Sequence, residues 1–243
     1  MIALPRAILF DLDETLLSFG KRPLLLAEVA EEFAAALAPI APLELADLLE
    51  AHFRDFWSDP ERHKAWRFTL GAARRKLVGD VFDALRPRAP GLTPEMATAF
   101  AERFHAYREE QARFFPGALE AVDALKRRGV KLALVTNGAA DVQRAKIERF
   151  ELSHRFEHIQ IEGEAGFGKP EEQAYRHAMA ALGVEAHETW MVGDNLEWEV
   201  AAPQRLGIHA IWHDHLGVGL PKDSSIKPDR IILSIGELTE NLG

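Results

Sequence analysis

The sequence of 243 residues contains no cysteine, which removes a large group of chemistries. Disulfide bonds, thiolate metal sites and cysteine nucleophiles are excluded, and nothing favours an oxidising compartment. Positive charge is also scarce, because 38 acidic against 29 basic residues give a formal net charge of −9. Such a balance disfavours broad binding to nucleic acid or to anionic lipid. We therefore expect no nucleic-acid or membrane partner.

Long apolar runs are missing as well. Met1 to Arg6 lack the charged flank and apolar core of a signal peptide, and Asp11 and Asp13 interrupt the next apolar run. The uncharged stretch between Glu32 and Glu44 contains prolines and is far shorter than the roughly 20 apolar residues that a membrane helix needs. We therefore expect a cytoplasmic protein, either a monomer or a homodimer.

The clearest pattern that the sequence does contain begins at Lys131. From there, short β-branched and apolar runs alternate with amphipathic stretches, which is typical of strand–helix units that build a parallel sheet. Pro170 is expected in the first turn of a helix over 171–182, and Gly183 in the left-handed position that ends it. With one early run, the pattern predicts strands at 7–10, 131–135, 158–161, 190–192, 209–212 and 230–233.

Residues 20 to 112 behave differently, because they contain no convincing strand and their apolar residues recur at helical spacing. Thr93 followed by Pro94 has the N-cap and first-turn pattern of a helix. The predicted fold is α/β: a doubly wound, parallel, Rossmann-like sheet from residues 1–18 and 113–243, with an all-helical domain inserted at 19–112.

Polar residues follow three of the predicted strands at the point where each strand ends. They are Asp11 with Asp13 after the first, Thr136 with Asn137 after the second, and Asp194 after the fourth. Any one of them alone fits an ordinary turn. Because ligands bind outside the carboxyl ends of parallel strands, we expect these side chains to converge on one site together with Lys169.

The charges of such a site require a cation. Two carboxylates about 4 Å apart repel by roughly 4 kcal/mol at an effective dielectric of about 20, and a phosphate dianion would add to the repulsion. Asp11 and Asp194 offer oxygen donors without clustered histidines, which favours Mg²⁺. Lys169 would supply a second positive charge to phosphoryl oxygens, and Thr136 a hydroxyl group.

Four motifs in this order resemble those of the haloacid dehalogenase superfamily of aspartate-nucleophile hydrolases. They are Asp11 to Leu16, Thr136 to Gly138, Lys169 with Pro170, and Gly193 to Asn195 with Glu199. The resemblance covers the chain outside residues 19–112, and the position of that insertion matches the helical cap domain of the family.

The resemblance implies a role for each motif residue. Asp11 would attack phosphorus and form an aspartyl-phosphate, while Asp13 would protonate the leaving oxygen and then deprotonate the attacking water. The phosphoryl group would be bound by Thr136, Asn137 and Lys169. The Mg²⁺ ligands would be Asp11, the backbone carbonyl of Asp13, and Asp194.

The fourth motif departs from the family pattern. Glu199 stands where the last aspartate is usual, and Trp198 precedes it where a small polar residue is common. With Asn195, Glu199 is expected beside the metal ligands, where its extra methylene lets it reach a metal-bound water or Lys169. Alternatively, Glu199 and Glu197 belong to a solvated first helical turn, which favours acids through the helix dipole.

The function predicted from these residues is Mg²⁺-dependent hydrolysis of a small phosphomonoester. Asp13 argues against the dehalogenating branch of the family, because expelling halide needs no proton donor. Thr15 resembles the phosphatase form of the first motif rather than that of sugar-phosphate mutases. A mutase remains one alternative, and a phosphate-binding or regulatory protein without turnover remains the other.

Four further features favour ordinary structural explanations. The segment from His52 to Arg88 is basic, which fits a solvated helix face better than substrate steering. Glu162 to Gly168 is expected to form a flexible connection before Lys169. Trp57, Trp66 and Phe68 are expected in the core rather than stacked on a nucleobase. The group of His209, His213 and His215 is explained better by a turn than by a metal site.

Overall fold

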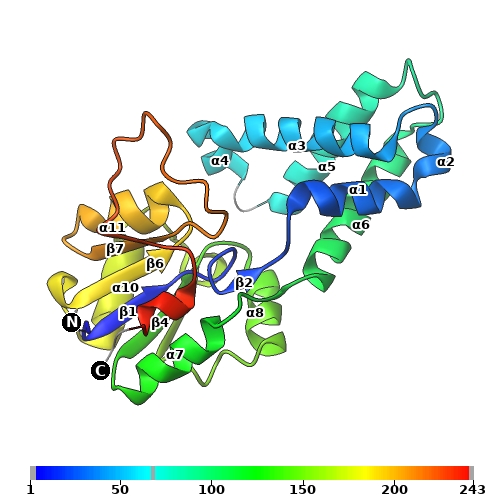
Figure 1. Ribbon diagram of the computed structural model, residues 1–243. Helices are drawn as coiled ribbons and strands as arrows, with labels where there is room; N and C mark the ends of the chain where they lie inside the picture. The colour runs from blue at the N-terminus through cyan, green and yellow to red at the C-terminus, as the bar shows by residue number, and fades with distance from the viewer. Residues whose placement is uncertain (1–3, 67–68, 241–243) are drawn as a thin grey trace. The chain divides into compact units, whose positions relative to one another are not determined.

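A computed structural model describes residues 4–66 and 69–240 of the chain (Figure 1). The chain divides into two compact units. One consists of Met1–Ser18 and Arg113–Gly243, and the other of Phe19–Ala112. The first is called the sheet unit below and the second the helical unit.

The sheet unit is built on six parallel strands in the order β5-β4-β1-β6-β7-β8. Chain order therefore runs outward from β1 in both directions, which confirms the predicted doubly wound sheet. The strands are β1 (Ala7–Phe10), β4 (Lys131–Thr136), β5 (His158–Ile161), β6 (Thr189–Gly193), β7 (His209–His213) and β8 (Arg230–Ile232).

Helices cover both faces of this sheet (Figure 1), which is why β1 is buried along its whole length. Ala7 and Leu9 pack with Tyr175 on one face, whereas Phe10 contacts the edge of Phe156 at a ring-centroid distance of 6.4 Å. The helical segments are α7 (Ala118–Arg127), α8 (Ala140–Arg149), α9 (Glu162–Ala165), α10 (Glu172–Leu182), η1 (Ala186–Glu188), η2 (Leu196–Ala201), α11 (Ala202–Gln204) and η3 (Ile235–Leu238).

One local prediction about the sheet unit is wrong. Pro170 is not in the first turn of α10, because Glu171 keeps an extended backbone as the N-cap and the helix begins at Glu172. Gly183 does end this helix in the left-handed region, as predicted. The structure also contains a two-residue antiparallel ribbon, β2 (Leu17–Ser18) with β3 (Arg113–Phe114), which is too short to produce a sequence pattern.

Every regular element in the described part of the helical unit is a helix. Thr93 caps the last of them by accepting a hydrogen bond from the Met96 backbone N–H at 3.2 Å, as the sequence predicted. The helices are α1 (Arg22–Glu32), α2 (Ala34–Leu37), α3 (Pro42–Ser58), α4 (Pro60–Trp66), α5 (Leu70–Leu85) and α6 (Pro94–Glu110).

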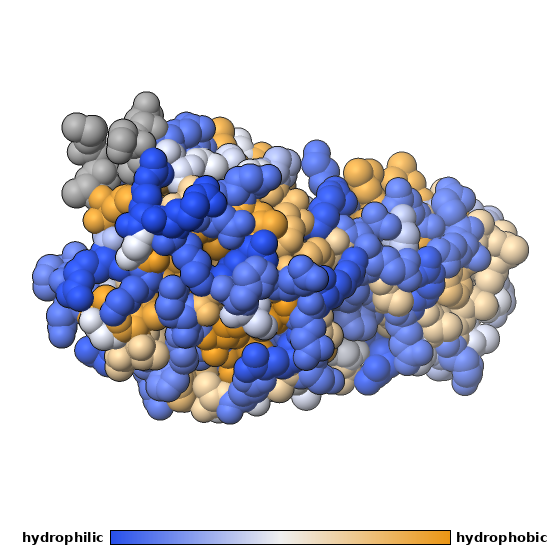
Figure 2. Space-filling model, turned by 90° about the horizontal axis from the view of Figure 1, so that it is seen from below, coloured by the Kyte–Doolittle hydropathy of each residue, from blue (hydrophilic) through white to orange (hydrophobic). Residues whose placement is uncertain are grey.

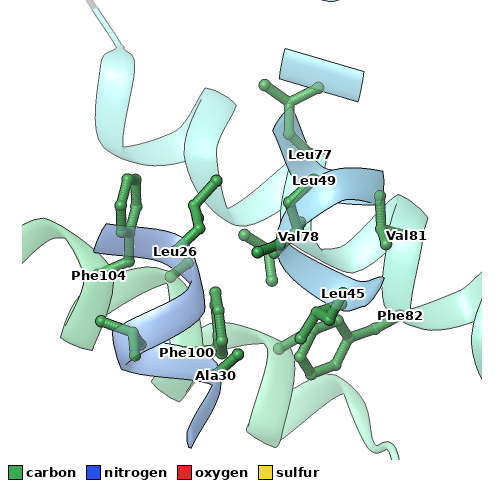
Figure 3. Packing of buried hydrophobic residues seen from close by; sticks show 14 of the residues in the cluster. Leu26, Ala30, Leu45, Leu49, Leu77, Val78, Val81, Phe82, Phe100 and Phe104 are labelled. Carbon is green, nitrogen blue, oxygen red and sulfur yellow. The ribbon is translucent and has the colours of Figure 1, made fainter. Parts of the chain in front are cut away.

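The helical unit has an apolar core of its own. Figure 3 shows Leu26 and Ala30 from α1 beside Phe100 and Phe104 from α6, with residues of α3 and α5 completing the cluster. Trp57 and Trp66 pack against this core, which confirms their structural interpretation. The side chains of Lys64, Arg67 and Phe68 lie outside the described part of the chain.

Charged residues of the basic segment pair along the helix surfaces. Lys76 and Asp80 lie one helical turn apart on α5 at 2.6 Å, and Arg62 pairs with Asp59 at 3.2 Å. This is the solvated helix face that the sequence favoured.

Polar and charged residues cover much of the face drawn in Figure 2, with apolar residues in separate patches. Among the described residues, no helix combines the length and apolar character needed to cross a membrane.

Candidate active site

The candidate site lies at the carboxyl ends of the three middle strands. Asp11 follows β1, Thr136 ends β4, and Asp194 follows β6. Because β4 and β6 lie on opposite sides of β1, the connections leaving them diverge and open the crevice in which doubly wound sheets bind ligands. The fold therefore brings together residues that are up to 183 positions apart in the sequence.

Lys169 is completely buried and links two of the predicted motifs. Its Nζ atom lies 2.6 Å from Oδ1 of Asp11 and 2.8 Å from Oε1 of Glu199. Burial by itself would lower the pKa of Lys169, but the two carboxylates outweigh burial and raise the pKa above its usual value. Lys169 is therefore a fixed positive charge at the centre of the site.

Glu199 belongs to the π-helix η2 and is buried rather than solvated, which corrects the helix-face alternative for this residue. Its Oε2 atom accepts a hydrogen bond from the Asn195 backbone N–H at 2.8 Å. A Cβ atom at Gly193 would overlap the side chain of Glu199, so a glycine is needed there for the glutamate to reach Lys169. Burial and the nearby Asp11 raise the pKa of Glu199.

The other polar residues of this motif have structural partners. Glu197 is exposed and pairs with Arg205 at 3.0 Å, so the solvated interpretation holds for it. Asn195 caps η2, because its side chain accepts hydrogen bonds from the backbone N–H groups of Glu197 and Trp198, each at 3.0 Å. Asn195 therefore shapes the segment that carries Glu199.

Asn137 connects two motifs through its side chain. Its Nδ2 donates to the Lys169 carbonyl at 2.7 Å, and its Oδ1 accepts from the Lys169 backbone N–H at 2.9 Å.

Glu162, which no sequence motif indicated, is buried and accepts a hydrogen bond from the Gly138 backbone N–H at 3.1 Å. The segment before Lys169 starts with the short helix α9 and is not simply the flexible connection expected. The position of Glu162 directly after the strand β5 is the signal that could have identified it.

Asp13 has two carboxylate oxygens in different surroundings. Oδ2 accepts a hydrogen bond from Lys146 Nζ at 2.7 Å, whereas Oδ1 is buried without a hydrogen-bond partner among the described residues. Lys146 and the neighbouring Gln143 lie on α8, and the motif pattern did not single them out. The next residue, Glu14, has a φ of 60°, a left-handed conformation that is uncommon outside glycine.

The electrostatics of Asp194 fit a bound divalent cation. Burial, followed by the negative charges of Glu199 and Asp11, raises the pKa of Asp194 well above its usual value, and Lys169 only partly opposes this. Three carboxylates thus face one ammonium group. The oxygen donors suit Mg²⁺. Within the described residues, no three His, Asp or Glu side chains are arranged as a metal site. The predicted Mg²⁺ ligands do not require such a group, because they are two carboxylates and one backbone carbonyl.

The rings of His213 and His215 lie 5.6 Å apart, but no group of three possible metal ligands occurs among the described residues. His209 begins the strand and His213 ends it, and the chain then turns, with the Gly217 N–H donating to the Asp214 carbonyl at 2.9 Å. The turn predicted for this segment is confirmed. Burial lowers the pKa of His213 to about 4. Neither ring nitrogen of His213 has a hydrogen-bond partner among the described residues.

The chain matches the family model of haloacid dehalogenase-like hydrolases over residues 5–207. Phosphoserine phosphatase from Thermus thermophilus is 35% identical over 185 residues, which cover 76% of this chain and 65% of that protein. The aligned part therefore spans slightly less than two thirds of that relative. Glyceraldehyde 3-phosphate phosphatase from Pyrococcus furiosus is 28% identical over 216 residues, which cover 85% of this chain and 80% of that protein.

A solved structure shares the fold. The HAD-hydrolase YfnB from Bacillus subtilis, in a crystal structure bound to magnesium, has a TM-score of 0.73 and 21% identity, and the match covers 98% of both chains. The chain belongs to the haloacid dehalogenase-like hydrolases, which confirms the resemblance seen in its motifs.

Proposed function

We propose that this chain is a Mg²⁺-dependent phosphomonoester hydrolase that acts on a small phosphorylated metabolite. The observation that carries the proposal is the buried ammonium group of Lys169, held between Asp11 and Glu199 at the end of the central strand. A fixed cation beside a carboxylate nucleophile suits an anionic phosphoryl group. The names of the two relatives, a phosphoserine phosphatase and a glyceraldehyde 3-phosphate phosphatase, support the same class of reaction.

Two aspartates would divide the reaction into two steps. In the first, a carboxylate oxygen of Asp11 bonds to phosphorus while the ester P–O bond breaks, and Asp13 gives its proton to the departing oxygen. In the second, water attacks the phosphorus, the bond between Asp11 and phosphorus breaks, and Asp13 takes a proton from the water. The enzyme ends in its starting state, with inorganic phosphate and an alcohol as products.

Lys169 and the hydroxyl of Thr136 would bind the phosphoryl oxygens. Asn137 would contribute through its backbone, because its side chain is engaged with the main chain of Lys169. Glu199 would hold Lys169 in place rather than touch the substrate.

The residues that would hold Mg²⁺ are Asp11, Asp194 and the backbone carbonyl of Asp13. When bound, the ion supplies positive charge that offsets the carboxylates and stabilises the phosphoryl oxygens. The raised pKa of Asp194 supports this assignment, because it reflects burial first and then the negative charges of Glu199 and Asp11, which a bound cation would offset. The assignment of residues 19–112 as the cap, the cytoplasmic location and the monomeric or homodimeric state remain predictions.

The experiment that tests this proposal measures phosphate release from a panel of monoesters after metal removal, with and without added Mg²⁺. The panel includes phosphoserine, glyceraldehyde 3-phosphate, phosphoglycolate, sugar phosphates and nucleoside monophosphates. We expect at least one ester to be hydrolysed only with Mg²⁺, and Asp11→Asn to lose that activity.

Other outcomes identify the alternatives. Binding of esters without turnover, or equal rates for the wild type and Asp11→Asn, indicates a phosphate-binding protein without the proposed catalysis. Transfer of phosphate between positions of one sugar, without net release, indicates a mutase.

A further inference from the structure

We propose that Lys146 and Gln143 are positioning residues that determine which oxygen of Asp13 exchanges the proton and how the Thr136 hydroxyl is oriented. The inference rests on the proposed function, because it assumes the acid–base role of Asp13. It adds two residues that lie outside the four motifs and are contributed by one helix, α8.

The first observation is that the donors around Asp13 are arranged asymmetrically. Lys146 Nζ lies 2.7 Å and Gln143 Nε2 3.4 Å from the same oxygen, Oδ2. Oδ1 is buried and has no hydrogen-bond partner in the described part of the chain. Because both donors engage one oxygen, Oδ1 is the atom left to carry the proton to the leaving oxygen. The side chain of Lys146 is only 7% exposed, so water competes little for its ammonium group.

The second observation joins Asp13 to the phosphate-binding loop. Gln143 Nε2 also lies 2.5 Å from Oγ1 of Thr136 and 3.1 Å from the Asn137 carbonyl. An amide nitrogen only donates, so Oγ1 must accept this hydrogen bond. The Thr136 hydroxyl hydrogen then remains for another acceptor, either the Asn137 carbonyl at 3.5 Å or a phosphoryl oxygen. The long distance to the carbonyl favours the phosphoryl oxygen when substrate is bound.

Helix geometry explains why one segment can do both. Gln143 and Lys146 are three residues apart on α8 and therefore share a face. Both are buried, although their residue types are usually exposed. Burying a lysine in a helix is costly unless its charge is paired, and Asp13 supplies that pairing.

The leaving group of the ester separates this role from a general structural one. An alkyl alcohol needs a proton as the P–O bond breaks, whereas p-nitrophenolate leaves without one. The ratio kcat/KM reports the steps up to the departure of the alcohol. A residue that positions the proton on Asp13 should therefore matter for an alkyl ester and little for p-nitrophenyl phosphate, while a residue that orients Thr136 should matter for both.

The test compares kcat/KM of the full chain with Mg²⁺ for the best alkyl ester of the panel and for p-nitrophenyl phosphate. We expect Lys146→Met to lower the value for the alkyl ester by about 10- to 100-fold, part of the roughly 10²- to 10⁴-fold that acid–base catalysis supplies. The loss for p-nitrophenyl phosphate should be several-fold smaller. Lys146→Arg, which keeps charge and donors, should recover part of the alkyl-ester rate, and Gln143→Met should slow both esters.

The matched control is Arg144→Met on the same helix, because Arg144 pairs with Glu164 on the surface at 2.5 Å. It removes one positive charge from α8 and should leave both rates unchanged. If Lys146→Met does not fold, as judged by thermal unfolding, Lys146→Gln carries the same comparison. Unchanged rates, or equal losses for both esters, overturn the role of Lys146 while the phosphatase proposal stands. A wild type that hydrolyses no ester overturns both proposals.

Discussion

The ion pairs around Lys169 in the sheet unit and the surface pair of Lys76 and Asp80 in the helical unit differ in burial and in their contribution to the site. In the sheet unit, the side chains of Lys169 and Glu199 are no more than 1% exposed and that of Asp11 is 10% exposed. In the helical unit, the pair of Lys76 and Asp80 is 46% and 41% exposed. Burying ions costs several kcal/mol per ion, whereas exposed pairs cost little and contribute little. The costly arrangement occurs where the chemistry is proposed.

The helical unit depends instead on apolar packing. Leu26, Phe82 and Phe100 are completely buried in its core (Figure 3). Each such side chain contributes roughly 1.5–3 kcal/mol through burial, more than any of the surface pairs around it. Charge is part of the proposed site in the sheet unit, whereas the exposed pair of Lys76 and Asp80 is expected to add little to the stability of the helical unit. Substitutions in the two units test this contrast.

The largest effect is expected from Lys169→Met. The substitution leaves Asp11 and Glu199 buried without their cation, so we expect a loss of about 3–5 kcal/mol in the free energy of unfolding. Phosphatase activity should fall to background, because the phosphoryl group also loses its cation. Urea unfolding and phosphate release measure the two effects. A variant with wild-type stability would show that the buried charges are already compensated without Lys169.

The next effect concerns pH and the buried His213. In the unfolded chain its imidazole takes up a proton near pH 6.5, but in the folded chain only near pH 4. The unfolded state therefore binds more protons between these values, so this stability is present above pH 6.5 and is lost as the pH falls toward 4. We expect a loss of about 2 kcal/mol between about pH 7 and pH 5. Urea unfolding of His213→Leu, whose stability should lack this part of the pH dependence, is the control.

A loss of similar size is expected for Gly193→Ala. The added Cβ overlaps Glu199, and overpacking of this kind costs about 1–3 kcal/mol. Because Glu199 must move away from Lys169, activity should fall by more than the stability loss alone explains. The control is Gly79→Ala in the helical unit, where a Cβ atom would meet nothing within 4 Å. If Gly193→Ala kept the same activity as Gly79→Ala, the contact between Glu199 and Lys169 would not be needed for activity.

The same contrast explains how much the sequence could predict. Strands were predicted because their apolar runs are local, and Asp11, Thr136 and Asp194 could be placed because each follows such a run directly. The burial of Glu199 could not be predicted, since it depends on the π-helix and on the space beside Gly193.

The residues of α8 illustrate a second limit. Gln143 and Lys146 occur in a helix whose pattern of charges looks ordinary, and their importance emerges only when β1 and β4 bring Asp13 and Thr136 beside them. Sequence spacing specifies which residues share a helix face but not what that face meets.

The smallest effect is expected for the exposed pair in the helical unit. Lys76→Ala removes the ion pair with Asp80, which also lies 3.4 Å from His52. Solvent screens both side chains, so the loss should be only about 0.3–0.5 kcal/mol, and less at high salt. A double-mutant cycle with Asp80→Ala, measured by urea unfolding at low and high salt, isolates the pair from the other effects of each substitution. A coupling above about 1.5 kcal/mol would exceed what exposed pairs supply and would mean that charge supports the helical unit as well.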